Sequence, residues 1–591
     1  MIAQIVPLRR LPPWLDNFDY QIPASWPQPK LGQLAMIPFK GQTLTGVIVG
    51  LKKSSSQKNL RPLTSLLEVS LTKNQLELAA WLSRFYHLSP ALLLRLMAPV
   101  IPQRNSSADT PAKSFSPLAN LGGLPKITNV TAQAWLIYNS EIGLLAYLQS
   151  LLKRTTVQTL IVIPDNHNLQ LLAVWSRRLA GRQSCLIMPK KTNKKAYWQA
   201  WQQSQTVNLV IGNWQALLLP FKKLGQIIVI ETDNLQFHQA EQSPRLHLKD
   251  FLQPLAKLYQ AKLLLTTVSP NLELFYDLKK SLPLRRLSSE RPQIKLVDLE
   301  QERRLGNYDL LSEAASQAVK TANGPALLYL NKLDYAKVVR CRDCQWQADC
   351  RHCGQALAWD QDQKNLRCWN CLRRQSLVLK CPACGGSNLK GSGAGLQKLQ
   401  SQTAKQFPDK KISLINALTA KATKDLNSAD IILATSAILS QPRHWAVTVM
   451  VDADQDLRTS DFQAGQNLRR QILKLNLYSQ SLFIQTRRTE HYVFRTLDDW
   501  PAFYQQELAF RQTFGYPPLV TSYKIFLKGQ AAGLETELLA ELPAAQVGGV
   551  SHLKNQTAVI VRGTLTSAFI DKLQKKYQDN ILIETNPYNW L

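Results

Sequence analysis

Eight of the chain's nine cysteines lie in one short window, arranged as four C-x-x-C pairs. The pairs are Cys341 with Cys344, Cys350 with Cys353, Cys368 with Cys371, and Cys381 with Cys384. Two residues between paired thiolates let a tight turn present both sulfurs to one tetrahedral metal, and four sulfurs complete a closed zinc shell. We therefore expect two structural Zn²⁺ ions in a small module with no open position for catalysis. Spacing alone leaves sequential and nested combinations of the pairs open.

The chain is also strongly basic, with 71 Lys and Arg residues against 41 Asp and Glu residues and a formal net charge of +30. Hydrophobic residues make up 45% of its 591 residues and charged residues 19%, which is typical of folded domains. This length predicts roughly three to five domains. So basic a protein favours a nucleic-acid partner, because each neutralised phosphate releases a counterion and adds affinity. An RNA- or ribosome-associated zinc protein is the alternative that the charge leaves open.

The sequence has no uninterrupted apolar run of the roughly 18 residues that a membrane span requires. Its first residues, MIAQIVPLRRLPPW, contain neither the long apolar segment nor the small-residue cleavage site of a secretory signal. We therefore expect a cytoplasmic protein without a membrane partner.

Short apolar segments alternate with helical patterns through most of the chain. The first set is TLIVIP, LVIGN, QIIVIE and KLLLTT, and the second is ALLYLN, KISLIN, DIILATS, VTVMVD and SLFIQT. This alternation predicts two parallel-sheet α/β lobes, the second of which is interrupted by the cysteine-rich window. Earlier pieces such as FDYQIP and LTGVIVGL predict a β-rich domain at the N-terminus. A smaller α+β domain is expected from residue 519 onward.

Two such lobes normally bind a nucleoside triphosphate between them, but the chain has no G-x-x-x-x-G-K-[ST] phosphate loop. A motor without phosphate-binding amides, a Lys for the γ-phosphate and a hydroxyl for magnesium cannot position or activate ATP. We therefore assign no catalytic residue, and we do not expect ATP and Mg²⁺ to support hydrolysis.

These features together resemble the PriA family of replication-restart helicases. The similar segments are CRDCQWQADCRHCGQALAWD with the later LRCWNC and KCPACGG, DDWPAFYQQELAFRQTFGYPPL, and FDYQIP followed by IPFKGQTLTGVIVG. The resemblance implies two degenerate RecA-like helicase lobes with a cysteine-rich two-zinc insertion in the second, an N-terminal β-rich DNA-binding domain and a C-terminal α+β domain. The implied domains are a 3′-end DNA-binding domain (1–102), a linker (103–132), the first lobe (133–300), the start of the second lobe (301–338), the zinc-binding region (339–390), the rest of the second lobe (391–518) and the C-terminal domain (519–591).

The resemblance also implies which residues bind metal and DNA. The outer pairs, Cys341, Cys344, Cys381 and Cys384, would share one zinc, and the inner pairs, Cys350, Cys353, Cys368 and Cys371, would share the other. In the family, a pocket in the N-terminal domain holds the last nucleotide of a 3′ strand end. The matching residues here are Phe18, Asp19, Gly41 and Arg61. They predict binding to forked or single-stranded DNA and to 3′ ends.

The motor motifs are where the sequence departs from the family. The segment WLIYNSEIGLLAYLQSLL keeps a strand–helix pattern at the P-loop position but has no glycine-rich loop and no Lys. The DEEH box reads ETDN (Glu231–Asn234), and the stretch that should supply an arginine finger, QILKLNLYSQS, has no arginine. We therefore expect a DNA-binding component of the replication restart primosome that recruits restart proteins without helicase activity. The alternative is an active ATP-dependent 3′–5′ DNA helicase with a divergent nucleotide site.

Overall fold

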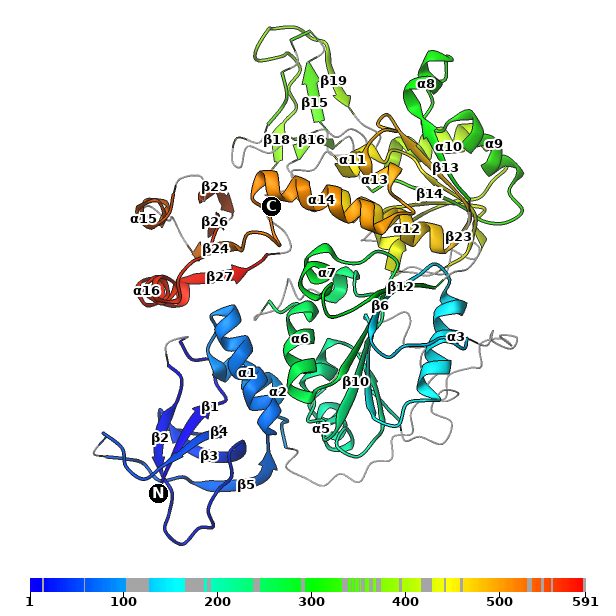
Figure 1. Ribbon diagram of the computed structural model, residues 1–591. Helices are drawn as coiled ribbons and strands as arrows, with labels where there is room; N and C mark the ends of the chain where they lie inside the picture. Colours follow the sequence, from blue (N-terminus) through cyan, green and yellow to red (C-terminus); the bar gives the residue numbers. More distant parts are fainter. Residues whose placement is uncertain are drawn as a thin grey trace. The chain divides into compact units, whose positions relative to one another are not determined.

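A computed structural model divides the chain into two units (Figure 1). The first comprises Met1–Leu287 and Gly563–Tyr588, and the second is formed mainly by Ser288–Arg562. The structure describes the chain apart from residues 13–14, 58, 102–126, 165–184, 189–192, 238–244, 288–292, 332–337, 342, 345, 350, 352–356, 361–364, 368–373, 393–395, 416–427, 441–442, 458–460, 529–533, 544–546, 554–555 and 588–591. Among the described residues, no helix has the length and apolar character needed to span a bilayer.

The N-terminal domain is an antiparallel sheet followed by two helices. The strands, in the order β2-β1-β4-β3-β5, are β1 (Ile2–Pro7), β2 (Phe18–Gln21), β3 (Gln33–Phe39), β4 (Gln42–Lys52) and β5 (Ser65–Ser70). Lys40 and Gly41 form the turn between β3 and β4, with φ angles of 48° and 78°. Positive φ at both central residues matches the twist of a two-residue hairpin. Helix α1 (Lys73–Tyr86) begins with a capping box between Thr72 and Gln75, and α2 (Pro90–Met97) follows it.

The first α/β lobe contains a seven-stranded sheet in the order β12-β6-β11-β10-β7-β9-β8, and its paired strands are parallel. The strands are β6 (Ala134–Tyr138), β7 (Gln158–Val162), β8 (Cys185–Ile187), β9 (Leu209–Gly212), β10 (Leu224–Val229), β11 (Lys262–Thr267) and β12 (Leu284–Leu287). The helices are α3 (Glu141–Leu152), α5 (Lys194–Gln203), α6 (Leu248–Tyr259) and α7 (Leu272–Leu278). Figure 1 shows α3 on one face of the sheet and α6 on the other. Cover on both faces explains why β6, β7 and β9 are buried throughout.

Helix α1 shares a hydrophobic core with this lobe. The Gln75 side chain donates a 2.8 Å hydrogen bond to the Leu218 carbonyl, and the Tyr86 hydroxyl donates to the carboxylate of Asp250. Burial, followed by the Asp250 charge, raises the pKa of Tyr86 well above its usual value. The N-terminal domain is therefore anchored to the first lobe by packing and by buried polar contacts.

The second lobe has a parallel sheet in the order β13-β23-β22-β14-β21-β20. Its strands are β13 (Gln293–Asp298), β14 (Ala326–Tyr329), β20 (Ile412–Ile415), β21 (Ile431–Ala434), β22 (Trp445–Met450) and β23 (Ser479–Thr486). Its helices are α8 (Leu299–Arg304), α9 (Glu313–Thr321), α10 (Leu396–Gln406), α11 (Asp454–Leu457) and α12 (Ala464–Leu477). The cysteine-rich insertion lies between β14 and α10 and contains β15 (Val338–Cys341), β16 (Ala358–Asp360), β17 (Asn365–Arg367), β18 (Arg374–Ser376) and β19 (Leu389–Ser392). β15 pairs with β19, and β16, β17 and β18 form a second small antiparallel sheet.

The C-terminal elements are divided between the two units. The second unit includes α13 (Tyr492–Arg495), α14 (Trp500–Phe514), β24 (Ser522–Lys528), α15 (Leu534–Glu541), β25 (Val547–Leu553) and β26 (Gln556–Arg562). Helix α16 (Ser567–Tyr577) and β27 (Ile581–Thr585) belong to the first unit, where the Gln574 side chain donates a 2.8 Å hydrogen bond to the His87 carbonyl at the end of α1. The β-rich start, the two α/β lobes, the inserted cysteine module and the C-terminal α+β elements confirm the predicted fold class.

Candidate metal centre and DNA-binding sites

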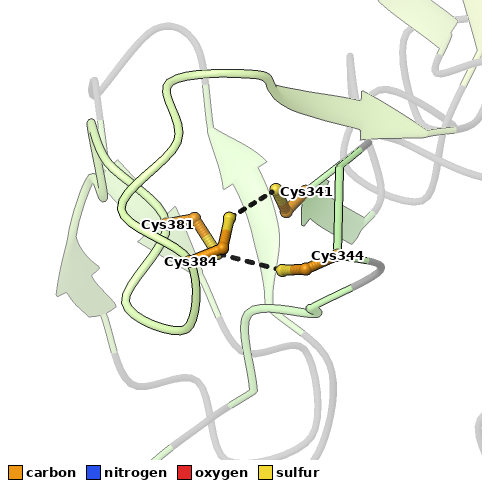
Figure 2. Close-up of side chains that lie close together, drawn as sticks. All are labelled: Cys341, Cys344, Cys381 and Cys384. Carbon is orange, nitrogen blue, oxygen red and sulfur yellow. Dashed lines mark hydrogen bonds between the residues drawn. The ribbon is translucent and has the colours of Figure 1, made fainter.

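Four of the clustered cysteines come together in the insertion (Figure 2). Their Sγ atoms all lie within 4.8 Å of one another, with 3.6 Å between Cys341 and Cys384 and 3.5 Å between Cys344 and Cys381. A tetrahedral site with Zn–S bonds of about 2.3 Å has sulfur–sulfur edges of about 3.8 Å, whereas a disulfide requires about 2.05 Å. The four sulfurs therefore form a cluster that can bind zinc.

Strand pairing brings the two cysteine loops together, and backbone N–H groups lower the pKa of one of the thiols. Cys341 is the last residue of β15 and lies opposite Leu389 of β19, which places one cysteine loop beside the other. Burial acts to raise the pKa of Cys381, but the N–H groups of Cys384 and Ala383 donate to its sulfur, and the pKa is lowered to about 7. Because the thiolate is the form that binds metal, such N–H donation favours Cys381 as a ligand at neutral pH. At Cys384 a backbone N–H acts to lower the pKa, but the neighbouring sulfurs act in the opposite direction and raise its pKa to about 12, and the pKa of Cys344 is raised as well.

The remaining cysteines have different positions. Cys350, Cys353, Cys368 and Cys371, which we predict to bind a second zinc, lie outside the described residues. Cys185 is a half-buried residue of β8 in the first lobe.

Two of the predicted DNA contacts, Phe18 and Gly41, lie on neighbouring segments of the N-terminal domain. The half-buried Phe18 ring of β2 meets the Phe39 ring edge-on, with 5.3 Å between their centroids. Phe39 ends β3 and precedes the turn that contains Gly41. Gly41 is exposed, and a Cβ built on it would have no neighbouring atom within 4 Å. The edge of an aromatic ring and an open turn therefore lie next to each other. Sequence analysis had not identified Phe39 as part of this site, although the segment IPFKG contains it.

Asp19 and Arg61, the other two predicted contacts, are arranged differently. Successive side chains of a strand point to opposite faces, so Asp19 points away from the Phe18 side of β2. Its carboxylate lies 2.6 Å from the Lys52 ammonium and accepts a hydrogen bond from the Ser55 hydroxyl. Burial acts to raise the pKa of Asp19, but the bonds from Lys52 and Ser55 outweigh it and lower the pKa below its usual value. The exposed Arg61 accepts a 3.0 Å hydrogen bond from the Gln21 N–H through its carbonyl, which places it beside the end of β2.

The position expected for a phosphate loop is a short turn. Only Asn139 and Ser140 connect β6 to α3, and the Ser140 hydroxyl caps the helix by accepting a 3.2 Å hydrogen bond from the Gly143 N–H. Glu141 adds an acidic side chain to the first turn of α3. A phosphate site needs several N–H groups turned towards an anion. A connection of two residues is too short for such a loop, and the Gly143 N–H is already bonded within the protein.

The acidic residues of ETDN form hydrogen bonds at the neighbouring strand ends. β6, β11 and β10 are adjacent in the sheet, so their carboxyl ends meet at one edge. The Asn234 amide donates a 2.8 Å hydrogen bond to Glu231, and the Thr267 hydroxyl donates to the carboxylate of Asp233. These carboxylates have protein partners within the lobe itself.

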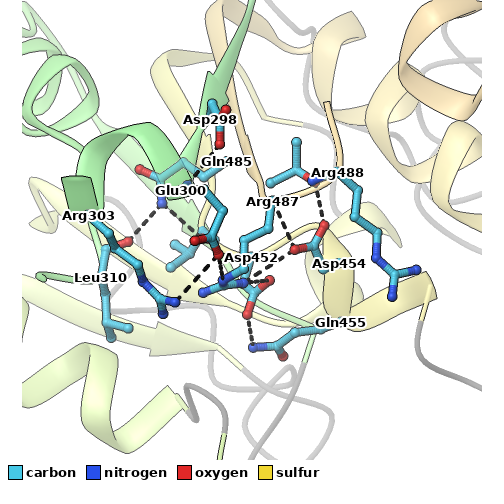
Figure 3. A network of polar contacts seen from close by, with 12 residues as sticks. Asp298, Glu300, Arg303, Leu310, Asp452, Asp454, Gln455, Gln485, Arg487 and Arg488 are labelled. Atoms are coloured by element: carbon cyan, nitrogen blue, oxygen red, sulfur yellow. Dashed lines mark hydrogen bonds and ion pairs between the residues drawn. The ribbon is translucent and has the colours of Figure 1, made fainter. Parts of the chain in front are cut away.

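The corresponding edge of the second lobe contains a network of ion pairs (Figure 3). Arg487, which follows β23, places Nη1 3.2 Å from Asp452 and 3.3 Å from Asp454, and its Nε lies 3.7 Å from Glu300. The Asp454 side chain is 1% exposed and also accepts hydrogen bonds from the Thr486 hydroxyl and the Arg487 N–H. A buried carboxylate with this many partners fixes the strand ends relative to each other. Sequence analysis missed this network, although DADQD and QTRR place acidic and basic residues directly after two strands.

No loop is present where an arginine finger would be expected. Helix α12 ends at Leu477 and β23 begins at Ser479, so Tyr478 alone connects them. Arg469, inside α12, is buried, and its guanidinium lies 5.3 Å from the Trp500 ring centroid. This arginine contributes to the hydrophobic core.

These features together define a protein with two parallel-sheet α/β lobes, a cysteine-rich insertion and an N-terminal domain built on an antiparallel sheet. Residues 5–99 match the PriA 3′DNA-binding domain (3′BD). The chain is 26% identical over 505 residues to the replication restart protein PriA of Bacillus subtilis (strain 168), an alignment that spans 75% of this chain and 62% of that protein. It is 24% identical over 643 residues to the PriA of Rickettsia conorii, spanning 99% of this chain and 94% of that protein. Over nearly its whole length the chain is therefore similar to PriA replication restart proteins.

Solved structures give distant similarities. RecG bound to a three-way DNA junction is 11% identical with a TM-score of 0.34, covering 64% of this chain and 44% of that chain. S. cerevisiae Dbp5 bound to RNA and ADP BeF3 is 10% identical with a TM-score of 0.33, and the match covers 64% of this chain and 89% of the Dbp5 chain. Similarities at this level carry no functional inference.

Proposed function

We propose that this chain binds forked or single-stranded DNA with a 3′ end during replication restart and does not hydrolyse ATP. The observation that carries the proposal is the connection between β6 and α3, which consists of Asn139 and Ser140 alone. A nucleotide bound there would find no cradle of N–H groups for its phosphates. The match of residues 5–99 to a 3′DNA-binding domain and the formal charge of +30 support DNA as the ligand.

The cysteine module completes the proposal. Cys341, Cys344, Cys381 and Cys384 would hold one zinc, and the inner four cysteines a second. Closed thiolate shells leave no site for metal-bound water, so the module acts in recognition, contributing to fork binding and to the recruitment of restart proteins.

The decisive experiment measures ATP hydrolysis and DNA binding together, using the zinc-loaded protein and a fork with a free 3′ end. Fork binding without hydrolysis is the expected result. DNA-stimulated hydrolysis that disappears in Glu231→Gln would favour the alternative, an active helicase with a divergent nucleotide site. Stronger competition by structured RNA than by DNA forks would instead identify an RNA-binding protein.

A substitution at the exposed turn tests the 3′-end pocket. Asparagine tolerates positive φ, so Gly41→Asn should preserve the turn and place a side chain where the DNA would lie. We expect binding to 3′-hydroxyl ends to weaken by about tenfold, the equivalent of one lost contact. Gly306→Asn is the matched control, because Gly306 also has positive φ (90°) and open space around its Cβ position. Equal binding by both variants would place the 3′-end site elsewhere.

A further inference from the structure

Two aromatic rings at the C-terminal end of α14 and a third just after the helix form a cluster. The helix is labelled in Figure 1. Phe510 and Phe514 are one helical turn apart, with ring centroids 4.9 Å apart, and they are 39% and 51% exposed. The Tyr516 ring lies 6.1 Å from each of them and is tilted by 28° from the plane of Phe514. We call these three residues the aromatic platform. Two exposed rings gathered beside a half-buried third are typical of a binding surface rather than of a solvated helix end.

A network of buried contacts fixes the position of the aromatic platform. The Arg511 side chain is completely buried and donates 3.0 Å hydrogen bonds to Glu507 and to the Pro517 carbonyl. Tyr516 stacks on Phe462, with 5.1 Å between the ring centroids and 26° between the planes. Because both the helix end and the segment that follows it are fixed, the rings would lose little conformational freedom on binding a ligand.

The charge around the platform indicates the kind of ligand. The Arg562 guanidinium lies 6.0 Å from the centroid of the Tyr516 ring and donates a 3.1 Å hydrogen bond to the Phe514 carbonyl. Glu507 is the one acidic residue of α14, and it is completely buried. From Trp500 to Phe514 the exposed surface of this helix therefore carries no negative charge, and the exposed Asp498 and Asp499 lie at its opposite end. The end with the rings lies beside a cation. This combination is complementary to an anionic ligand with flat, stackable groups.

We propose that the aromatic platform stacks bases of single-stranded DNA, with Arg562 binding an adjacent phosphate. Every base has a π-face, so stacking on aromatic rings tolerates any sequence, and a neighbouring arginine follows the backbone. The inference rests on the proposed function, since DNA is the ligand in both, but it concerns a surface in the other unit from the N-terminal domain. The platform would bind the strand at internal positions and would not require a 3′ end.

The test is binding of a thymidine oligonucleotide whose 3′ end is blocked by phosphate, measured by fluorescence anisotropy with the full zinc-loaded chain. An abasic oligonucleotide of the same length supplies the same phosphates without bases. Wild type should prefer the base-containing strand by about tenfold for each stacked base. The double variant Phe510→Ala with Phe514→Ala should lose this preference and keep its affinity for the abasic strand.

Two further variants make the test specific. Leu305→Ala with Tyr308→Ala removes side chains that are 77% and 80% exposed elsewhere in the same unit, and it should bind like wild type. Arg562→Gln should weaken binding to both oligonucleotides alike and reduce the dependence of binding on salt, because it removes one phosphate contact.

A base preference that persists in the double phenylalanine variant would overturn the inference. A wild-type chain that binds open 3′ ends but does not prefer bases in the blocked strand would also overturn it, while leaving the proposed function standing. That second result would assign the platform to a protein partner. If the chain bound neither DNA with an open 3′ end nor the 3′-blocked oligonucleotide, the proposed function would be refuted as well.

Discussion

Replacing Glu507 by alanine is expected to destabilise the second unit by about 3–5 kcal/mol, the usual cost of removing one member of a buried ion pair. Glu507 and Arg511 have no exposed side-chain surface, and Arg511 Nε lies 3.0 Å from Glu507 Oε1. The other carboxylate oxygen accepts a hydrogen bond from the Tyr492 hydroxyl. Alanine would therefore leave a guanidinium and a phenol buried without their acceptor.

Two related variants separate charge from hydrogen bonding. Glu507→Gln keeps a hydrogen-bond acceptor but loses the negative charge. It should therefore lower the free energy of unfolding by about 1–3 kcal/mol, as expected for a weakened buried hydrogen bond. Glu507→Leu combined with Arg511→Met and Tyr492→Phe removes the carboxylate, the guanidinium and the hydroxyl together. This variant should recover most of the stability, because apolar replacements of whole buried polar groups are often neutral.

The measurement is urea denaturation combined with hydrogen–deuterium exchange of the α14 peptide, which reports local opening of this unit. Glu490→Ala is the control, because the ion pair between Arg495 and Glu490 is 67% and 85% exposed and its loss should cost at most about 1 kcal/mol. If Glu507→Ala were no more destabilising than Glu490→Ala, the buried pair would not hold the end of α14, and the rigidity assigned to the aromatic platform would be wrong.

Three other predictions concern metal, pH and packing. Cys344→Ser should lose about one equivalent of zinc by atomic absorption while Cys185→Ser keeps full content, and unchanged zinc in the first variant would contradict the assignment. Burial lowers the pKa of His491 from 6.5, so the unfolded chain takes up the proton first as pH falls through that value. The free energy of unfolding should therefore decrease below about pH 6.5, and His491→Asn, which can also cap α13, should reduce that dependence in denaturation curves. Gly465→Ala would place its Cβ 2.3 Å from the Tyr492 hydroxyl oxygen and should lower stability by about 1–3 kcal/mol, again measured by denaturation.

The lobes were predictable because their strands are short, apolar and separated by helical patterns. Segments such as VTVMVD and QIIVIE are buried on both faces of a parallel sheet, and that burial leaves a direct trace in the sequence. The cysteine pairs were equally visible as metal ligands. Their spacing left sequential and nested combinations open, and the structure brings Cys341, Cys344, Cys381 and Cys384 together.

Other contacts could not be predicted, because they depend on strand register and on side-chain direction. The ion pair between Asp19 and Lys52 joins residues far apart in sequence, through the pairing of both β2 and β4 with β1. The absence of phosphate-loop residues was clear from the sequence. The length of the turn after β6 could be established only from the structure, which gives the exact ends of β6 and α3. Arg469 could have been read as a surface cation, and only its contacts with aromatic rings place it in the core.

The division of the first unit between the two ends of the chain has a consequence for synthesis on the ribosome. Helix α1 is made early, but α16, which supplies the Gln574 contact to the end of α1, follows only after the whole of Ser288–Arg562. At about 5–20 residues per second, the interval is on the order of tens of seconds. During that time the end of α1 is without its last partner, and the second unit must fold as an insertion within an unfinished one. Shortening the chain before Gly563 would make this transient state permanent.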